Sequence, residues 1–169
     1  SLRSRGSMMA TDSKPTNRKA TALALAVAIA VPMEGLRQAA YRDVTGLPTV
    51  CFGSTVGVKM GDFRTVPECK ALLTKEMTHV IETVDRCRPG LPPEVLAAFS
   101  DAAYNVGPHI ACDPVRSTAA RLLAAGDIAG GCRQLPRWNR ARVAGVSVEL
   151  PGLTKRRAME TELCLRGVA

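Results

Sequence analysis

The segment PMEGLRQAAYRDVTGLPTVCFGST (32–55) places two carboxylates and a hydroxyl where an apolar run gives way to glycine-rich sequence. Glu34 ends the apolar run, Asp43 follows after eight intervening residues, and Thr49 follows after five more. Glycines at 46, 53, 57 and 61 and the alternation around Val50 predict short strands and turns over 41–62. The segment therefore marks the boundary between a helix and a small β region.

Helical patterns follow this β region. Thr65 and Glu68 have the spacing of a capping box, which predicts a helix that runs to about Arg86. Further helices are expected from Pro93 to Gly107, over 116–125, and from Asp127 to Leu135. Thr154 is expected to cap a last helix that ends at Gly167. A small early β region and a mostly helical body give an α+β fold.

The sequence before Glu34 has a polar part and an apolar part. SLRSRGSMM (1–9) resembles a vector remnant, and residues 9–19 are polar, basic and expected to be disordered. Residues 20–33 carry no charge, and fourteen helical residues span about 21 Å, less than the ~30 Å hydrocarbon core of a bilayer. This run is either a marginal membrane segment or a buried first helix. The chain is accordingly divided into an arm (1–19), an apolar segment (20–33) and a domain (34–169).

Composition and charge narrow the class of protein. The 169 residues suit one globular domain with an arm, and because only 4% are aromatic the core must be built mainly from Ala, Leu and Val. The formal charge of +8 predicts attraction to nucleic acid, an anionic membrane or the bacterial cell wall, unless it marks only a solvated basic surface. Excluding Arg3 and Arg5 of the remnant lowers this charge to about +6.

The cysteines predict disulfides rather than a metal site. No two of them have CxxC spacing, and His79 and His109 are isolated, so neither a metal nor another cofactor is expected. An even number in a small domain favours disulfides and an oxidising compartment, with free buried thiols as the alternative. The six are Cys51, Cys69, Cys87, Cys112, Cys132 and Cys164.

Glu34 and Asp43 have the environments of an acid and a base. Glu34 follows an apolar segment, where desolvation favours the protonated form, whereas water and backbone amides in a turn keep Asp43 ionised. Such a pair is what glycoside hydrolysis requires, and the Thr49 hydroxyl is placed to hold a water molecule. The alternative is a helix-end carboxylate and a turn-forming aspartate.

The segment EGLRQAAYRDVTGLPTVCFG closely resembles the active-site segment of phage lysozymes, a muramidase family with the pattern Glu, eight residues, Asp, five residues, Thr. The resemblance continues through PECKALLTKEM, AAYNVG, RSTAARLLAAGDIAGGCRQLPRWN and GLTKRRAMETELCLRG. It covers about residues 34–169 and is closest to the endolysins of lambdoid phages.

The resemblance implies a two-lobed fold with a substrate cleft between the lobes. It implies hydrolysis of the β-1,4 bond between N-acetylmuramic acid and N-acetylglucosamine in peptidoglycan, in the host periplasm, for cell lysis. Glu34 would be the general acid, and Asp43 and Thr49 would position the attacking water. An inverting outcome follows by family analogy, but the sequence leaves it open because it depends on the separation of the carboxylates.

Further residues take roles from the same resemblance. Arg156 matches a family arginine that pairs with the catalytic glutamate and favours its ionised form, with Arg157 as the fallback and a basic helix face as the alternative. Asn105 and Trp138 are candidates for substrate binding in the cleft, although Trp138 could equally anchor the core. Ser54 stands where the family usually has His, a change expected to affect stability more than chemistry.

The apolar segment 20–33 resembles a signal-anchor-release element, which first tethers an endolysin to the inner membrane in an inactive state and then leaves the bilayer. Its short length and Pro32 favour the alternative of an ordinary first helix. The family pattern also pairs Cys87 with Cys112. The remaining pairs are taken as Cys132 with Cys164 and Cys51 with Cys69, and partner exchange at Cys51 would regulate activity.

Two rivals remain beside a monomeric muramidase that binds peptidoglycan. A cationic membrane- or nucleic-acid-binding protein would use the charge and the apolar run, but the basic residues lack aromatic interleaving and no nucleic-acid motif occurs, so nucleic acid is not an expected partner. A lytic transglycosylase would use one acid, and the presence of Asp43 and Thr49 argues against it.

Overall fold

The computed structural model describes residues 15–169, so the expected vector remnant and most of the arm lie outside the described residues. The helices are α1 (Pro15–Glu34), α2 (Val66–Cys87), α3 (Pro93–Val106), α4 (His109–Cys112), α5 (Thr118–Ala124), α6 (Ile128–Arg133), the 3-10 helix η1 (Leu135–Arg137) and α7 (Pro151–Arg166). The strands are β1 (Arg37–Arg42), β2 (Pro48–Cys51), β3 (Arg140–Val143) and β4 (Val146–Glu149).

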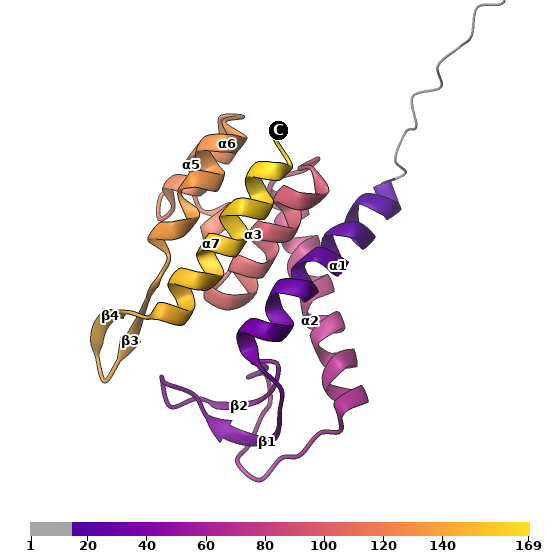
Figure 1. Ribbon diagram of the computed structural model, residues 1–169, viewed down its shortest axis with the longest axis vertical. Helices are drawn as coiled ribbons and strands as arrows, with labels where there is room; N and C mark the ends of the chain where they lie inside the picture. Colours follow the sequence, from indigo (N-terminus) through magenta and orange to yellow (C-terminus); the bar gives the residue numbers. More distant parts are fainter. Residues whose placement is uncertain (1–14) are drawn as a thin grey trace, which may run out of the picture.

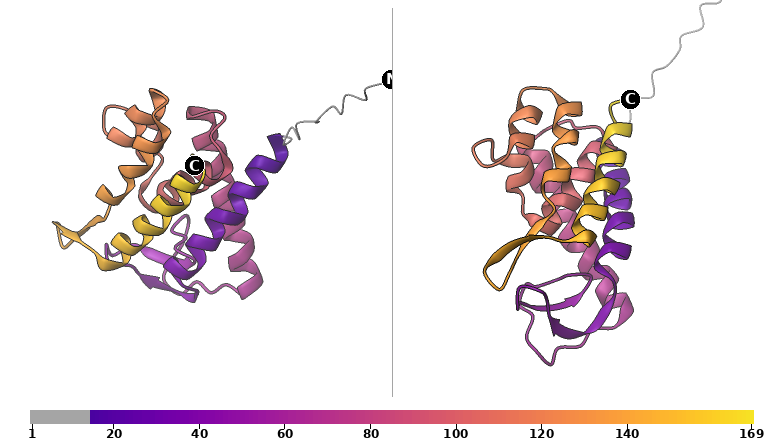
Figure 2. Two further views of the ribbon diagram at one scale, coloured as in Figure 1. Left: turned by 45° about the horizontal axis from the view of Figure 1, so that its top comes forward. Right: turned by 60° about the vertical axis from the view of Figure 1, so that its left-hand side comes forward.

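The α+β fold with two lobes that the sequence predicts is present. The antiparallel β1–β2 hairpin forms a small lobe at one end of the molecule, and the helices form the larger lobe above it (Figure 1). Helix α3 lies at the centre of the larger lobe and packs against α1, α2 and α7. Both further views keep the β1–β2 hairpin at the same end, next to the last turn of α1 (Figure 2).

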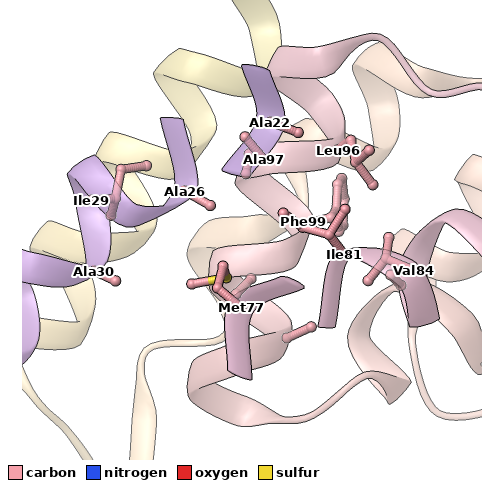
Figure 3. Packing of buried hydrophobic residues seen from close by; sticks show 14 of the residues in the cluster. Ala22, Ala26, Ile29, Ala30, Met77, Ile81, Val84, Leu96, Ala97 and Phe99 are labelled. Carbon is pink, nitrogen blue, oxygen red and sulfur yellow. The ribbon is translucent and has the colours of Figure 1, made fainter. Parts of the chain in front are cut away.

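The core is built from small and aliphatic side chains, as the low aromatic content requires. Four residues of α1 are buried against α2 and α3 (Figure 3): Ala22, Ala26, Ile29 and Ala30. They belong to the same core cluster as Met77 and Ile81 of α2 and Phe99 of α3. Alanines on this face let the helix axes approach closely, so the apolar segment has become the first helix of the folded domain.

Helix α1 begins before the expected boundary at residue 20. The expectation of disorder is wrong for residues 15–19, because Arg18 donates to Asp85 at 2.7 Å and to the Leu91 carbonyl at 2.9 Å. Lys19 pairs with Glu82 at 2.9 Å. These bonds to α2 and the loop after it hold the first turns in place. Within residues 15–169, no helix is both long enough and apolar enough to span a bilayer.

Helix α2 starts as predicted. The Thr65 hydroxyl accepts a hydrogen bond from the Glu68 N–H, and the Glu68 carboxylate accepts one from the Thr65 N–H, both at 3.3 Å. The capping box is therefore confirmed.

Helix α7 starts earlier than predicted, and the prediction that Thr154 caps it is wrong. Pro151 occupies the first helical position, where its missing N–H costs no hydrogen bond. Thr154 lies inside the first turn and accepts from the Asn139 side chain at 3.1 Å.

Three local elements differ from the expectation. The β3–β4 hairpin and the short helix α4 were not predicted, and β1 begins at Arg37, four residues before the expected β region. In the hairpin, RARVAGVSVE turns at Ala144 and Gly145, which have φ values of 50° and 80°. Two consecutive positive φ values form the tight turn that matches strand twist.

Disulfides join the helices and the small lobe. Cys51–Cys69 links β2 to α2, Cys87–Cys112 links α2 to α4, and Cys132–Cys164 links α6 to α7. These are the pairs expected from the sequence.

Candidate active site

Glu34 is the last residue of α1 and lies where the two lobes meet. Its carboxylate accepts a hydrogen bond from Nη1 of Arg156, which α7 supplies from 122 positions further along the chain. The Arg156 side chain is 3% exposed and the Glu34 side chain 19%, so the pair is largely withdrawn from water. The expected partner is therefore Arg156 and not the fallback Arg157.

Asp101 of α3 completes the surroundings of Arg156, and sequence reasoning missed it. Its two carboxylate oxygens accept from Nε and Nη2 of Arg156 at 2.8 and 2.7 Å, and the residue is fully buried. Burial lowers the pKa of Arg156, but the hydrogen bonds and charge of Asp101 and then the charge of Glu34 outweigh burial and raise it. The guanidinium therefore stays charged.

Asn105 and Trp138, the expected substrate-binding residues, contact Arg157. Arg157 donates to Asn105 Oδ1 at 2.9 Å, to the Trp138 carbonyl at 3.4 Å and to Glu160 at 2.8 Å. The Trp138 ring packs edge-on against His109, with ring centres 5.3 Å apart. Trp138 is half-buried and also lines a surface pocket with Arg116 and Gln134, so both its substrate-binding role and its role as a core anchor stay predictions.

Asp43 lies in the turn between β1 and β2. Its Oδ1 accepts from the Thr45 N–H at 2.8 Å, the Thr45 hydroxyl at 2.6 Å and the Leu47 N–H at 2.9 Å. Desolvation raises the pKa of Asp43, but the hydrogen bonds from Thr45, Leu47 and Gly46 together outweigh it and lower the pKa. The turn thus keeps this carboxylate ionised, as the sequence predicts.

Thr49 and Tyr41 face each other across the β1–β2 hairpin. Thr49 is buried, and its hydroxyl donates to the Leu47 carbonyl at 2.9 Å. Burial raises the pKa of Tyr41, the charges of Glu34 and Asp43 raise it further, and Arg37 lowers it. Tyr41, the pairing partner of Thr49, therefore lies within the electrostatic influence of both carboxylates.

Gly53 provides the space that the Glu34 carboxylate occupies. It has a φ of +81°, and a Cβ placed on it would lie 2.7 Å from Glu34 Oε2. Any side chain here would collide with the acid, so only glycine fits both the backbone and the contact. The glycine is visible in the sequence, but its contact with Glu34 is not.

Ser54 connects the small lobe to α2 and α3. Its hydroxyl donates to Glu76 Oε1 at 2.5 Å, and the Tyr104 hydroxyl lies 2.7 Å from the Phe52 carbonyl and 3.2 Å from Glu76 Oε2. The serine that replaces the usual family histidine therefore has a hydrogen-bond partner of its own. This network holds the loop that carries Gly53 against the helical lobe.

Known proteins resemble this chain over most of its length. The Phage lysozyme family model matches residues 31–160. The SAR-endolysin of Pseudomonas phage phiKMV is 37% identical over 148 residues, which are 87% of this chain and 90% of that protein. The SAR-endolysin of Enterobacteria phage P21 is 35% identical over 168 residues, covering 90% of this chain and 98% of the relative. The solved endolysin from Escherichia coli O157:H7 phage FAHEc1 is 27% identical and superposes with a TM-score of 0.71 over 86% of this chain and 90% of its own.

Proposed function

The chain belongs to the phage lysozyme family, and we propose that Glu34, Asp43 and Thr49 carry out the hydrolysis by which this endolysin degrades peptidoglycan and lyses the host cell. The bond cleaved is the β-1,4 linkage between N-acetylmuramic acid and N-acetylglucosamine. Glu34 gives its proton to the bridging oxygen as the bond from that oxygen to the anomeric carbon breaks. Water attacks the anomeric carbon and passes a proton to Asp43.

The different surroundings of the two carboxylates support these roles. Asp43 is held ionised by hydrogen bonds in its turn, which suits a group that accepts a proton and stabilises positive charge on the sugar. Glu34 is largely withdrawn from water and orients one oxygen toward Arg156. Thr49 lies on β2 of the same hairpin as Asp43, and its hydroxyl helps to position the attacking water.

The observation that carries the proposal is the convergence of three separate parts of the chain on Glu34. Helix α1 supplies the acid, α7 supplies Arg156, and the loop after β2 approaches the carboxylate at Gly53. This convergence favours a functional role for Glu34 over that of a simple helix-end carboxylate.

Turbidity loss of Gram-negative cells with permeabilised outer membranes tests the proposal. The Glu34→Gln variant is expected to lose wall clearing, because an amide cannot donate the required proton. Glu162→Gln, the same substitution at an exposed position of α7, is the matched control and should clear cells like the wild type. A membrane- or nucleic-acid-binding protein without catalysis would keep its effect in both variants.

We also propose that α1 acts as a signal-anchor-release segment and that the enzyme works in the periplasm after a transient inner-membrane tether. Six of the similar proteins are SAR-endolysins. Between Ala22 and Val31, the exposed positions of α1 are apolar as well, namely Ala24, Ala28 and Val31. While α1 is tethered to the membrane instead of packed against α2 and α3, Glu34 is separated from Arg156 and Gly53, and the site is not assembled.

Fractionation of the untagged protein before and after membrane depolarisation tests this tether. The protein is expected in the membrane fraction first and in the soluble periplasmic fraction afterwards. Protein that is soluble throughout would exclude the tether and leave the hydrolytic proposal intact.

A further inference from the structure

Asp101 and Glu34 share the guanidinium of Arg156. An arginine presents five N–H donors in a rigid plane. Asp101 accepts the Nε–H and one Nη2–H, at 2.8 and 2.7 Å, which fixes that plane and turns Nη1 toward Glu34. The carboxylate of Asp101 is fully buried on α3, so its position is set by the packing of the core.

The charges in this cluster act against one another. A guanidinium in contact with a carboxyl group favours the ionised form of that group. A general acid must instead hold its proton until the bond breaks. Asp101 places a full negative charge on the far side of Arg156, so the guanidinium is already compensated when it meets Glu34.

We propose that Asp101 is a positioning residue for the hydrolysis: it orients Arg156 and compensates its charge, so that Arg156 holds Glu34 in place as the proton donor. The inference rests on the proposed function, because it takes Glu34 as the general acid. Asp101 itself does not touch the substrate.

Other titratable groups face Glu34 from each element packed against it. Tyr41 lies on β1, Tyr104 on α3 beside Asp101, and Glu76 of α2 lies behind Tyr104. Burial is the largest cause that raises the pKa of both tyrosines, so neither gains a charge at neutral pH. The neighbouring Arg157 is taken up by Glu160. Arg156 is therefore the cation in direct contact with Glu34. Asp101 accepts hydrogen bonds from Nε and Nη2 of the same guanidinium.

The pH dependence of kcat/KM tests this role with Asp101→Asn. Without the negative charge of Asp101, Arg156 favours the ionised form of Glu34 more strongly. The alkaline limb should therefore move toward lower pH by about one unit. At a fixed pH above the limb, kcat/KM should then fall about tenfold. A merely structural residue would lower activity at every pH and leave the limb where it is in the wild type.

Glu160→Gln is the matched control. Glu160 is equally buried, bonds Arg157 and lies 3.8 Å from Arg156 Nε, but burial and the neighbouring Asp101 raise its pKa and favour its neutral form, so that glutamine changes the charge around Arg156 little. Its variant should lose stability and keep the alkaline limb. If Asp101→Asn does not fold, Asp101→Ser serves in its place, since the smaller neutral side chain leaves room for a water molecule against Arg156.

An alkaline limb that coincides with the wild type in a folded Asp101 variant would overturn the inference. This failure is distinct from failure of the proposed function. If Glu34→Gln keeps its activity, Glu34 is not the general acid and the proposed function fails. If Glu34→Gln is inactive but the alkaline limb of the Asp101 variant is unchanged, only the proposed role of Asp101 fails.

Discussion

At the scale of single residues, Glu34 depends on contacts from distant parts of the chain. Arg156 fixes one carboxylate oxygen, and Gly53 leaves room for the other. The acid is thus restrained on two sides by groups that lie in different lobes. Restraint of this kind is what allows a single carboxyl group to meet a glycosidic oxygen in a productive geometry.

Gly53→Ala is expected to reduce kcat by about 100-fold, because displacing a reacting group by about 1 Å has an effect of that size. The new Cβ would lie 2.7 Å from Glu34 Oε2 and force the carboxylate away. Gly57→Ala is the control: it also has a positive φ, but a Cβ there meets nothing within 4 Å. Both variants should lose about 1 kcal/mol of stability from backbone strain, and only the first should lose activity. Equal activities in the wall-clearing assay would refute the contact argument.

Thr45→Val is expected to move the acid limb of the pH–activity profile toward higher pH. The Thr45 hydroxyl is one of the hydrogen bonds that lower the pKa of Asp43 against desolvation. Because folding lowers the pKa of Asp43, the ionised carboxylate stabilises the fold at pH values above its pKa in the unfolded chain. This stabilisation is lost as the pH falls through its pKa in the folded protein. Loss of the Thr45 hydroxyl raises the pKa of Asp43 in the folded protein. Thr45→Ser keeps the hydroxyl and should restore the limb, and identical limbs in all three proteins would contradict this role.

The sequence could identify Glu34, Asp43, Thr49 and Arg156 as candidates because a family pattern links them by spacing. It could not identify Asp101, whose partner lies 55 positions away in the chain. A buried aspartate on an alanine-rich helix has no local sequence signature. Its partner Arg156 reaches it only when α3 and α7 pack together. The contact between Gly53 and Glu34 is hidden for the same reason.

At the scale of elements, local signals predicted some boundaries and missed others. The capping box at Thr65 and the Gly107 helix end were readable because the responsible residues are neighbours in the chain. The start of α7 was misplaced because Pro151 competes with Thr154 as the first-turn signal. The start of α1 depends on ion pairs with Asp85 and Glu82 of α2, which no local pattern displays.

The buried face of α1 should be sensitive to side-chain volume. Ala26→Leu places three additional heavy atoms in a fully buried position and should lower the free energy of unfolding by about 1–3 kcal/mol. Ala28→Leu makes the same change on the exposed face of the same helix and should change stability by less than about 0.5 kcal/mol. Urea unfolding followed by circular dichroism measures both, and equal stabilities would contradict the packing of α1 against α2 and α3.

At the scale of the whole molecule, the net charge of +8 is expected to attract the protein to the polyanionic cell wall. The rate of clearing should fall as salt rises from low to physiological ionic strength, where the Debye length is about 8 Å. Hydrolysis of a soluble uncharged glycan is the control and should respond little, because it lacks the long-range attraction. A salt-independent clearing rate would show that the charge has no part in reaching the wall.

The central proposal is that Glu34 is the general acid, and the most direct test measures cleavage of the glycosidic bond. Purified peptidoglycan should gain new reducing ends with the wild-type enzyme, and Glu34→Gln should release them at least about 100-fold more slowly, the usual range for loss of a general acid. Glu162→Gln should match the wild type. Reducing-end release by Glu34→Gln at a rate near that of the wild type would contradict the account.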